Sequence, residues 1–112
     1  MSTNYYARYN ICECCGRYDE MHIGSTYRAL QTQTGIRTWE QWCNFLRKPN
    51  IKVFDEYGRE LEVNEFIQGW TPRPNGELLV KEADEHWNRM FGTPSGDFLD
   101  DQGFYFIDRD FS

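Results

Sequence analysis

The sequence lacks the features that mark several familiar classes of protein. No apolar run reaches the length of about 18 residues that a membrane-spanning helix needs, so no membrane contact is expected. Residues 1–11 contain no apolar segment typical of a secretory signal, which predicts a cytoplasmic protein. The chain has two histidines, no Gly-rich phosphate loop and no Gly-x-Ser-x-Gly motif. We therefore recognise no catalytic set and expect a protein that is not an enzyme.

Positive charge is scarce in the second half of the chain. The formal net charge is −6, and residues 50–112 hold six Lys and Arg against fourteen Asp and Glu, whereas residues 1–49 hold six against four. A surface this acidic repels phosphate backbones, so direct nucleic-acid binding is not expected. The charge permits a basic protein partner or mimicry of DNA, and it is also typical of a solvated surface that aids solubility.

Cysteine is rare overall but concentrated near the N-terminus. Cys12 and Cys15 have the spacing with which a tight turn presents two thiolates to one zinc ion, and Gly16 supplies the positive φ that such a turn favours. A closed zinc site takes four ligands; His22 is the candidate for the third, and Cys43, His86, a carboxylate or water for the fourth. The sequence therefore predicts a structural zinc knuckle formed by Cys12, Cys15, His22 and Cys43.

Other interpretations of these residues stay open. Cys14 is one residue out of phase and is able to replace either neighbour as a ligand. Cys43 lies on a predicted helical face, where a lone cysteine is often an apolar filler of the core. Without a metal, the cluster would be a turn carrying reduced thiols or a redox pair, because a cytoplasmic location disfavours disulfides.

Several short motifs resemble a family of small bacteriophage proteins of uncharacterised function. The most specific are Thr3-Asn4-Tyr5-Tyr6, Cys12-Glu13-Cys14-Cys15-Gly16-Arg17 and His22-Ile23-Gly24, and weaker likeness continues in residues 39–42, 55–58 and 104–112. The resemblance implies a phage origin and a Cys and His ligand set, but no biochemical activity. This chain departs from the family pattern after Gly24, where the usual Lys is absent, and at Gln31, which stands where a second His is usual.

The spacing of apolar residues predicts short strands and two main helices. Thr38 is a good N-cap and Pro49 a stop for a helix over 38–48, with Trp39 and Trp42 on its apolar face. A second helix is predicted over 77–91, where the stripe of Leu79, Ala83, Trp87 and Met90 is typical of core packing. Strands are expected over 3–11, 20–34, 51–54, 61–63 and 104–107, with a brief helix over 64–69.

These elements predict one α+β domain spanning residues 1–112. We expect a small antiparallel sheet of four or five short strands, two main helices on one face, and the N-terminal Cys/His knuckle. Because the core is modest, a bound zinc ion would add folding free energy.

The function that fits this picture is binding rather than catalysis. We expect a phage-encoded protein that inhibits or redirects a host or defence protein complex, for example as an anti-CRISPR-type or transcription-machinery inhibitor. The candidate binding residues are the aromatic and basic pair Trp70 and Arg73 and the acidic residues Asp100, Asp101, Asp108 and Asp110.

Two alternative functions involve overlapping sets of residues. An acidic DNA mimic would align carboxylates on one face, and the candidates are Glu77, Glu82, Asp84, Glu85, Asp97, Asp100, Asp101, Asp108 and Asp110. A nucleotide-sequestering protein would stack a base on Trp70, Arg73 and the N-terminal tyrosines.

Overall fold

A computed structural model describes residues 3–25, 29–72 and 74–108. Within these ranges the chain forms β1 (Asn4–Tyr9), β2 (Asp19–Ser25), β3 (Ala29–Gln31), α1 (Trp39–Leu46), β4 (Lys52–Asp55), β5 (Glu60–Leu61), α2 (Val63–Gly69), α3 (Gly76–Phe91), β6 (Phe98–Leu99) and β7 (Tyr105–Ile107). The prediction of an α+β fold is confirmed. No helix in these ranges is long and apolar enough to cross a membrane.

The described strands form one sheet with the order β5-β4-β1-β2-β3-β7-β6. The sheet is mixed, because β3 and β7 pair in parallel while the other neighbouring strands pair antiparallel. The predicted antiparallel sheet of four or five strands was therefore too small and missed the parallel pair. Strand β1 lies inside the sheet between β2 and β4, so pairing on both edges holds this segment near the N-terminus in place.

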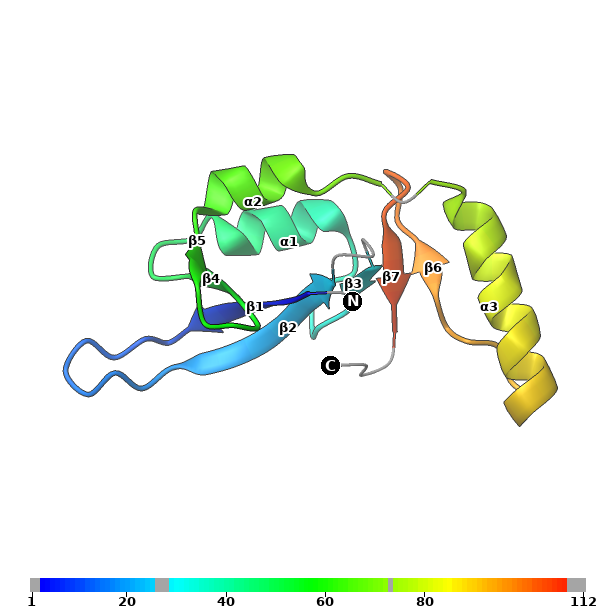
Figure 1. Cartoon of the computed structure of the whole chain (residues 1–112), viewed down its shortest axis with the longest axis horizontal. Helices are drawn as coiled ribbons and strands as arrows, with labels where there is room; N and C mark the ends of the chain where they lie inside the picture. Colours follow the sequence, from blue (N-terminus) through cyan, green and yellow to red (C-terminus); the bar gives the residue numbers. More distant parts are fainter. Residues whose placement is uncertain (1–2, 26–28, 73, 109–112) are drawn as a thin grey trace.

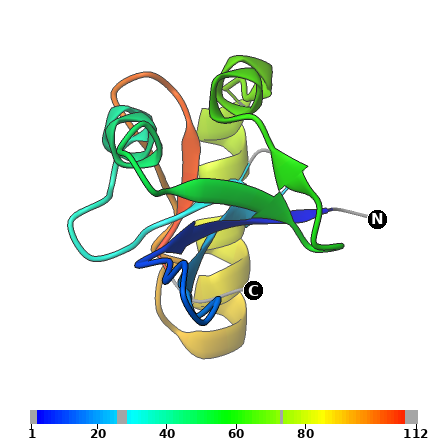
Figure 2. The same ribbon diagram turned by 90° about the vertical axis from the view of Figure 1, so that its left-hand side faces the viewer.

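Helices α1 and α2 cover one face of the sheet (Figures 1 and 2). Helix α1 begins where predicted, because the side chain of Thr38 accepts a hydrogen bond from the backbone N–H of Gln41. Its buried face includes Trp42, which is fully enclosed and donates from Nε1 to the carbonyl of Gln31 at 3.0 Å. That bond ties α1 to β3. The remaining core comes from the sheet and from α2, including Ala7, Ile23, Leu30, Val53, Phe66 and Phe106.

Helix α3 does not join this core, and here the prediction was wrong. It stands at the end of the sheet beside β6 (Figure 1), and the short α2 takes the place expected for it on the helical face. Of its residues only Gly76 is buried, against the side chain of Leu99. A helix of 16 residues is about 24 Å long, whereas β6 has two residues. The strand is thus too short to cover the apolar stripe.

Gly24 is required by close packing and not by a positive φ. A Cβ built there would lie 2.4 Å from the backbone oxygen of Ala29 and 3.2 Å from the ring of Trp70. We expect Gly24→Ala to lower the free energy of unfolding by about 1–3 kcal/mol, because backbone rather than a flexible side chain must move.

The matched control is Gly69→Ala, where an added Cβ meets no atom within 4 Å. Its stability should be unchanged or slightly raised, because the substitution restricts the unfolded chain. Urea denaturation of both variants measures the difference. Equal midpoints for the two variants would show that β2 and β3 do not approach each other this closely.

Candidate functional site

The β1–β2 hairpin carries the cysteine cluster at its tip. Beyond the last strand pair, Tyr9 opposite Asp19, the loop over residues 10–18 is closed by two backbone hydrogen bonds. The N–H of Cys12 donates to the carbonyl of Arg17, and the N–H of Gly16 donates to the carbonyl of Cys12, both at 2.8 Å. Gly16 has a φ of +74°, as the sequence predicted for the turn. The hairpin extends away from the helices (Figure 1).

The knuckle turns several hydrogen-bond donors towards the sulfur of Cys12. The backbone N–H of Cys15, the thiol of Cys15 and the backbone N–H of Cys14 together hold the pKa of the Cys12 thiol below its ordinary value. Cys14 and Cys15 are exposed and Cys12 is partly exposed. The arrangement is suited to stabilising a thiolate, which is the form that binds metals and attacks electrophiles.

The two other predicted zinc ligands lie elsewhere. His22 is buried in β2 opposite Tyr6, and its Nε2 lies 3.0 Å from Oδ1 of Asn4. Cys43 is buried in the core on α1, where burial raises the pKa of its thiol. Within the described ranges, no group of three or more His, Cys, Asp or Glu side chains is arranged to hold a metal ion. The knuckle itself fits two ligands of a tetrahedral site, and the zinc ion stays a prediction.

A polar cavity of about 890 Å³ lies between β2, the loop after β3 and α1. Its walls carry the side-chain amides of Gln31, Gln33, Gln41 and Asn44, and aromatic rings from Tyr9 and Phe45. Gln31 is only 6% exposed, and its Oε1 has no hydrogen-bond partner among the described residues. Protein atoms cover this oxygen, so the polar groups that a ligand can reach are the amides of the exposed Gln41 and Asn44.

The predicted stacking residues are only partly assembled. Trp70 is buried against Trp39 and Phe66, and it meets the ring of Tyr5 edge-on at 5.8 Å. Trp70 and Tyr5 line a smaller cavity of about 270 Å³, whose wall also carries the carboxyl groups of Glu62 and Glu65. Arg73 lies outside the described residues. The acidic wall does not suit a phosphate group, so this cavity gives little support to nucleotide binding.

Several of the candidate acidic residues serve the fold. Asp100 accepts hydrogen bonds from the backbone N–H groups of Trp39, Gln102 and Phe104, the first of which caps α1. Asp108 accepts from Thr32 and Arg37. Asp101 is exposed, and Asp110 lies outside the described residues.

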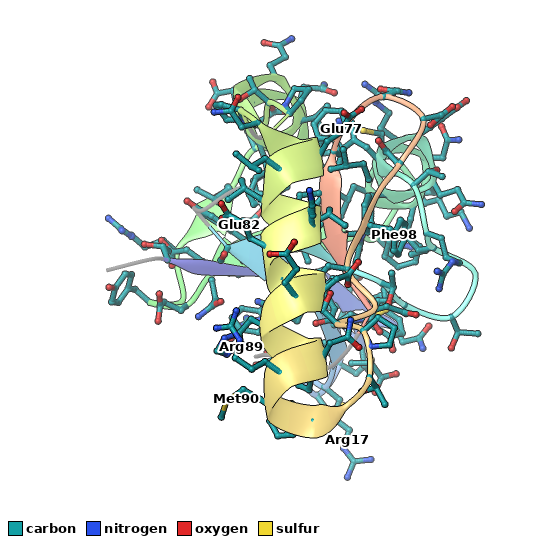
Figure 3. All side chains as sticks on the ribbon, turned by 90° about the vertical axis from the view of Figure 1, so that its right-hand side faces the viewer. Arg17, Glu77, Glu82, Arg89, Met90 and Phe98 are labelled. Atoms are coloured by element: carbon teal, nitrogen blue, oxygen red, sulfur yellow. The ribbon has the colours of Figure 1, made fainter. Side chains whose placement is uncertain are left out.

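Two carboxylates of the proposed DNA mimic are also bonded inside the chain. Asp97 accepts from the hydroxyl of Tyr105 at 2.5 Å, and Asp84 accepts from the backbone and hydroxyl of Ser95. Glu77, Glu82 and Glu85 on α3 are exposed, and the first two are visible in Figure 3. Four of the nine carboxylates are therefore engaged in hydrogen bonds within the chain.

Sequence reasoning missed the surface of α3. Trp87, Leu79, Val80 and Ala83 are half-buried, while Met90 and Phe91 are 61% and 62% exposed. The rings of Trp87 and Phe91 lie 4.5 Å apart. We call Leu79, Val80, Ala83, Trp87, Met90 and Phe91 the α3 stripe. Its helical spacing was visible in the sequence, but nothing there showed that too little of the sheet is available to cover it.

Comparisons with protein-family models, with curated proteins and with solved structures give no match. The functional assignment therefore depends on the residues and their arrangement.

Substituting Asp100 and Asp101 one at a time distinguishes a carboxylate that stabilises the fold from a neighbouring carboxylate on the surface. We expect Asp100→Ala to lower the free energy of unfolding by about 1–3 kcal/mol, because it leaves three backbone N–H groups without their acceptor. Asp101→Ala should change it by less than about 0.5 kcal/mol. Thermal and urea denaturation measure both. Equal stability of the two variants would contradict the capping role.

Proposed function

We propose that this protein acts by binding a partner protein through the α3 stripe. The supporting observation is that a 16-residue amphipathic helix stands outside the core with large apolar side chains in solvent. An exposed apolar face costs solubility unless a partner covers it, and amphipathic helices commonly dock into apolar grooves of other proteins. Trp87, Phe91 and Met90 are residue types enriched in such interfaces.

Charge indicates the chemistry of the partner. Helix α3 carries four carboxylates against two basic side chains, and the whole chain has a formal charge of −6. Two copies of the chain would repel each other, whereas an apolar groove bordered by Lys and Arg would complement the stripe. We therefore expect a basic partner and not a second copy. The resemblance to small phage proteins makes a bacterial host or defence complex the class of partner to search first.

The role of the α3 stripe can be tested by substituting two apolar residues of α3, one inside the stripe and one outside it. Met90 lies in the stripe at its exposed end (Figure 3), and Leu78 is 54% exposed but is offset from Met90 by about 120° around the axis. We expect Met90→Gln to weaken partner binding at least about tenfold, as loss of an interface anchor does. Leu78→Gln should bind like the wild type. Glutamine is used because a charge would interact with the helix dipole.

The measurement has two stages, both with EDTA present. Quantitative mass spectrometry of proteins captured from bacterial host lysate first identifies any protein retained by wild type and Leu78→Gln but lost with Met90→Gln. Calorimetry with that purified protein then gives the dissociation constants. Equal binding by all three proteins would refute the assignment of the stripe. A dimer in sedimentation that Met90→Gln abolishes would show that a second copy covers it instead.

A second candidate function is supported by the polar cavity. The exposed amides of Gln41 and Asn44 and the flanking rings of Tyr9 and Phe45 suit a flat heterocycle with hydrogen-bonding edges, such as a nucleobase. This function would be the nucleotide-sequestering alternative, with the nucleotide in the polar cavity and not at Trp70 and Arg73 as the sequence predicted.

Nucleosides test this second candidate directly. If it holds, at least one of adenosine, guanosine, cytidine and uridine should raise the melting temperature of the wild type. Asn44→Ala should abolish the rise, whereas Asn64→Ala, at an exposed position on α2, should retain it. Differential scanning fluorimetry measures both. No rise with any of the four nucleosides would exclude nucleoside binding in this cavity.

A further inference from the structure

The cysteine knuckle presents two zinc ligands at an extremity of the molecule. The molecule measures 50 × 28 × 27 Å, and the hairpin tip projects beyond the sheet and helices at one end of the long axis (Figure 1). Cys12 and Cys15 are both accessible there, and the two bonds that close the turn hold them on one short loop. Among the described residues, no helix shields this loop in Figures 1 and 2.

The remaining ligands of a tetrahedral site do not come from the positions that the sequence suggested. Cys43 is enclosed in the core among the apolar side chains of α1 and the sheet. His22 lies four strand pairs along from the tip, counting from Tyr9 opposite Asp19 to Tyr6 opposite His22. Four residues of a strand span about 10 Å, whereas zinc–ligand bonds are about 2.0–2.3 Å. One knuckle therefore supplies half of a closed site.

We propose that Cys12 and Cys15 from two copies of this chain bind one zinc ion between two hairpin tips. Four thiolates are a common ligand set of closed, tetrahedral zinc sites, and each copy contributes two of them. On binding, each knuckle releases the protons of its two thiols to solvent. The site is complete only when both copies are present, so the metal and the dimer form together.

Charge at the tip allows this contact although the whole chain is acidic. Residues 10–18 carry one acidic side chain, Glu13, and one basic side chain, Arg17, so two approaching tips have no net repulsion of their own. A zinc ion with four thiolates has a net charge of −2, so the two joined tips would carry −2 in all, because the Glu13 and Arg17 side chains already cancel each other. The acidic residues of the second half of the chain lie mainly on other elements.

A contact between tips leaves α3 at the far end of each copy (Figure 1). The dimer would therefore display two α3 stripes, which would raise the apparent affinity for a partner with two sites. The zinc contact itself does not depend on the proposed function, because it uses none of the residues of α3.

The experiment measures metal content and mass together on the full chain in a reducing, metal-free buffer to which zinc is added. Elemental mass spectrometry should find about half a zinc ion per chain, and light scattering should find a mass twice the 13.4 kDa of the monomer. EDTA should return the protein to the monomer. Cys12→Ser and Cys15→Ser should lose both metal and dimer, while Cys14→Ser, in the same turn, should retain both.

Three other outcomes would overturn the proposal of a shared zinc ion. One zinc ion per chain in a monomer, lost in Cys43→Ser, would establish the site within one chain that the sequence suggested. A dimer that persists in EDTA would be held together by contacts other than zinc. If the wild type binds no zinc through Cys12 and Cys15, the knuckle is not a metal site. A zinc-linked dimer that fails to bind any partner protein would refute the role of α3 alone.

Discussion

The antiparallel pairing of β1 with β2 is the constraint on which the rest of the structure depends. The pairing runs from Asn4 opposite Ser25 to Tyr9 opposite Asp19, with one irregularity after Tyr5. It places Ala7 and Ile23 in the core, and it gives β4 and β3 the edges on which the sheet extends. The same two strands carry the cysteine turn away from the body. A register slip would therefore disturb the core and the tip together, because it moves side chains to the opposite face.

Local signals in the sequence were sufficient to predict those elements whose structure depends on residues close together in the chain. Thr38 and Pro49 bracket α1, and Gly16 closes the cysteine turn. Where distant segments decide, the sequence was insufficient. The parallel pairing of β3 with β7 joins residues more than seventy positions apart, and no local pattern encodes it. The stripe of α3 has the spacing of a core helix, but its burial depends on the length of β6, which has only two residues.

The difference between local and long-range signals also explains which parts of the candidate sites could be predicted. The Cys-x-x-Cys spacing predicted a turn, and the turn is present, but the spacing contains no information on where His22 and Cys43 lie in space. The acidic residues were grouped by charge alone, whereas the fold uses Asp100 as a helix cap and Asp97 as the acceptor for a buried tyrosine hydroxyl. Buried hydrogen bonds of this kind depend on tertiary contacts, which the linear order of charges does not show. The polar cavity likewise combines β2, α1 and the loop between Gln31 and Trp39.

The central claim is that α3 stands outside the cooperative core and is available to a partner. Hydrogen–deuterium exchange of the free protein, followed by peptide mass spectrometry, tests it most directly. Because α3 packs chiefly against the two-residue β6, its amides should exchange at least about tenfold faster than those of β1 and α1, through local opening. They should become protected when a partner is bound. Equal protection of α3 and β1 in the free protein would show that the helix belongs to the core and would contradict the account.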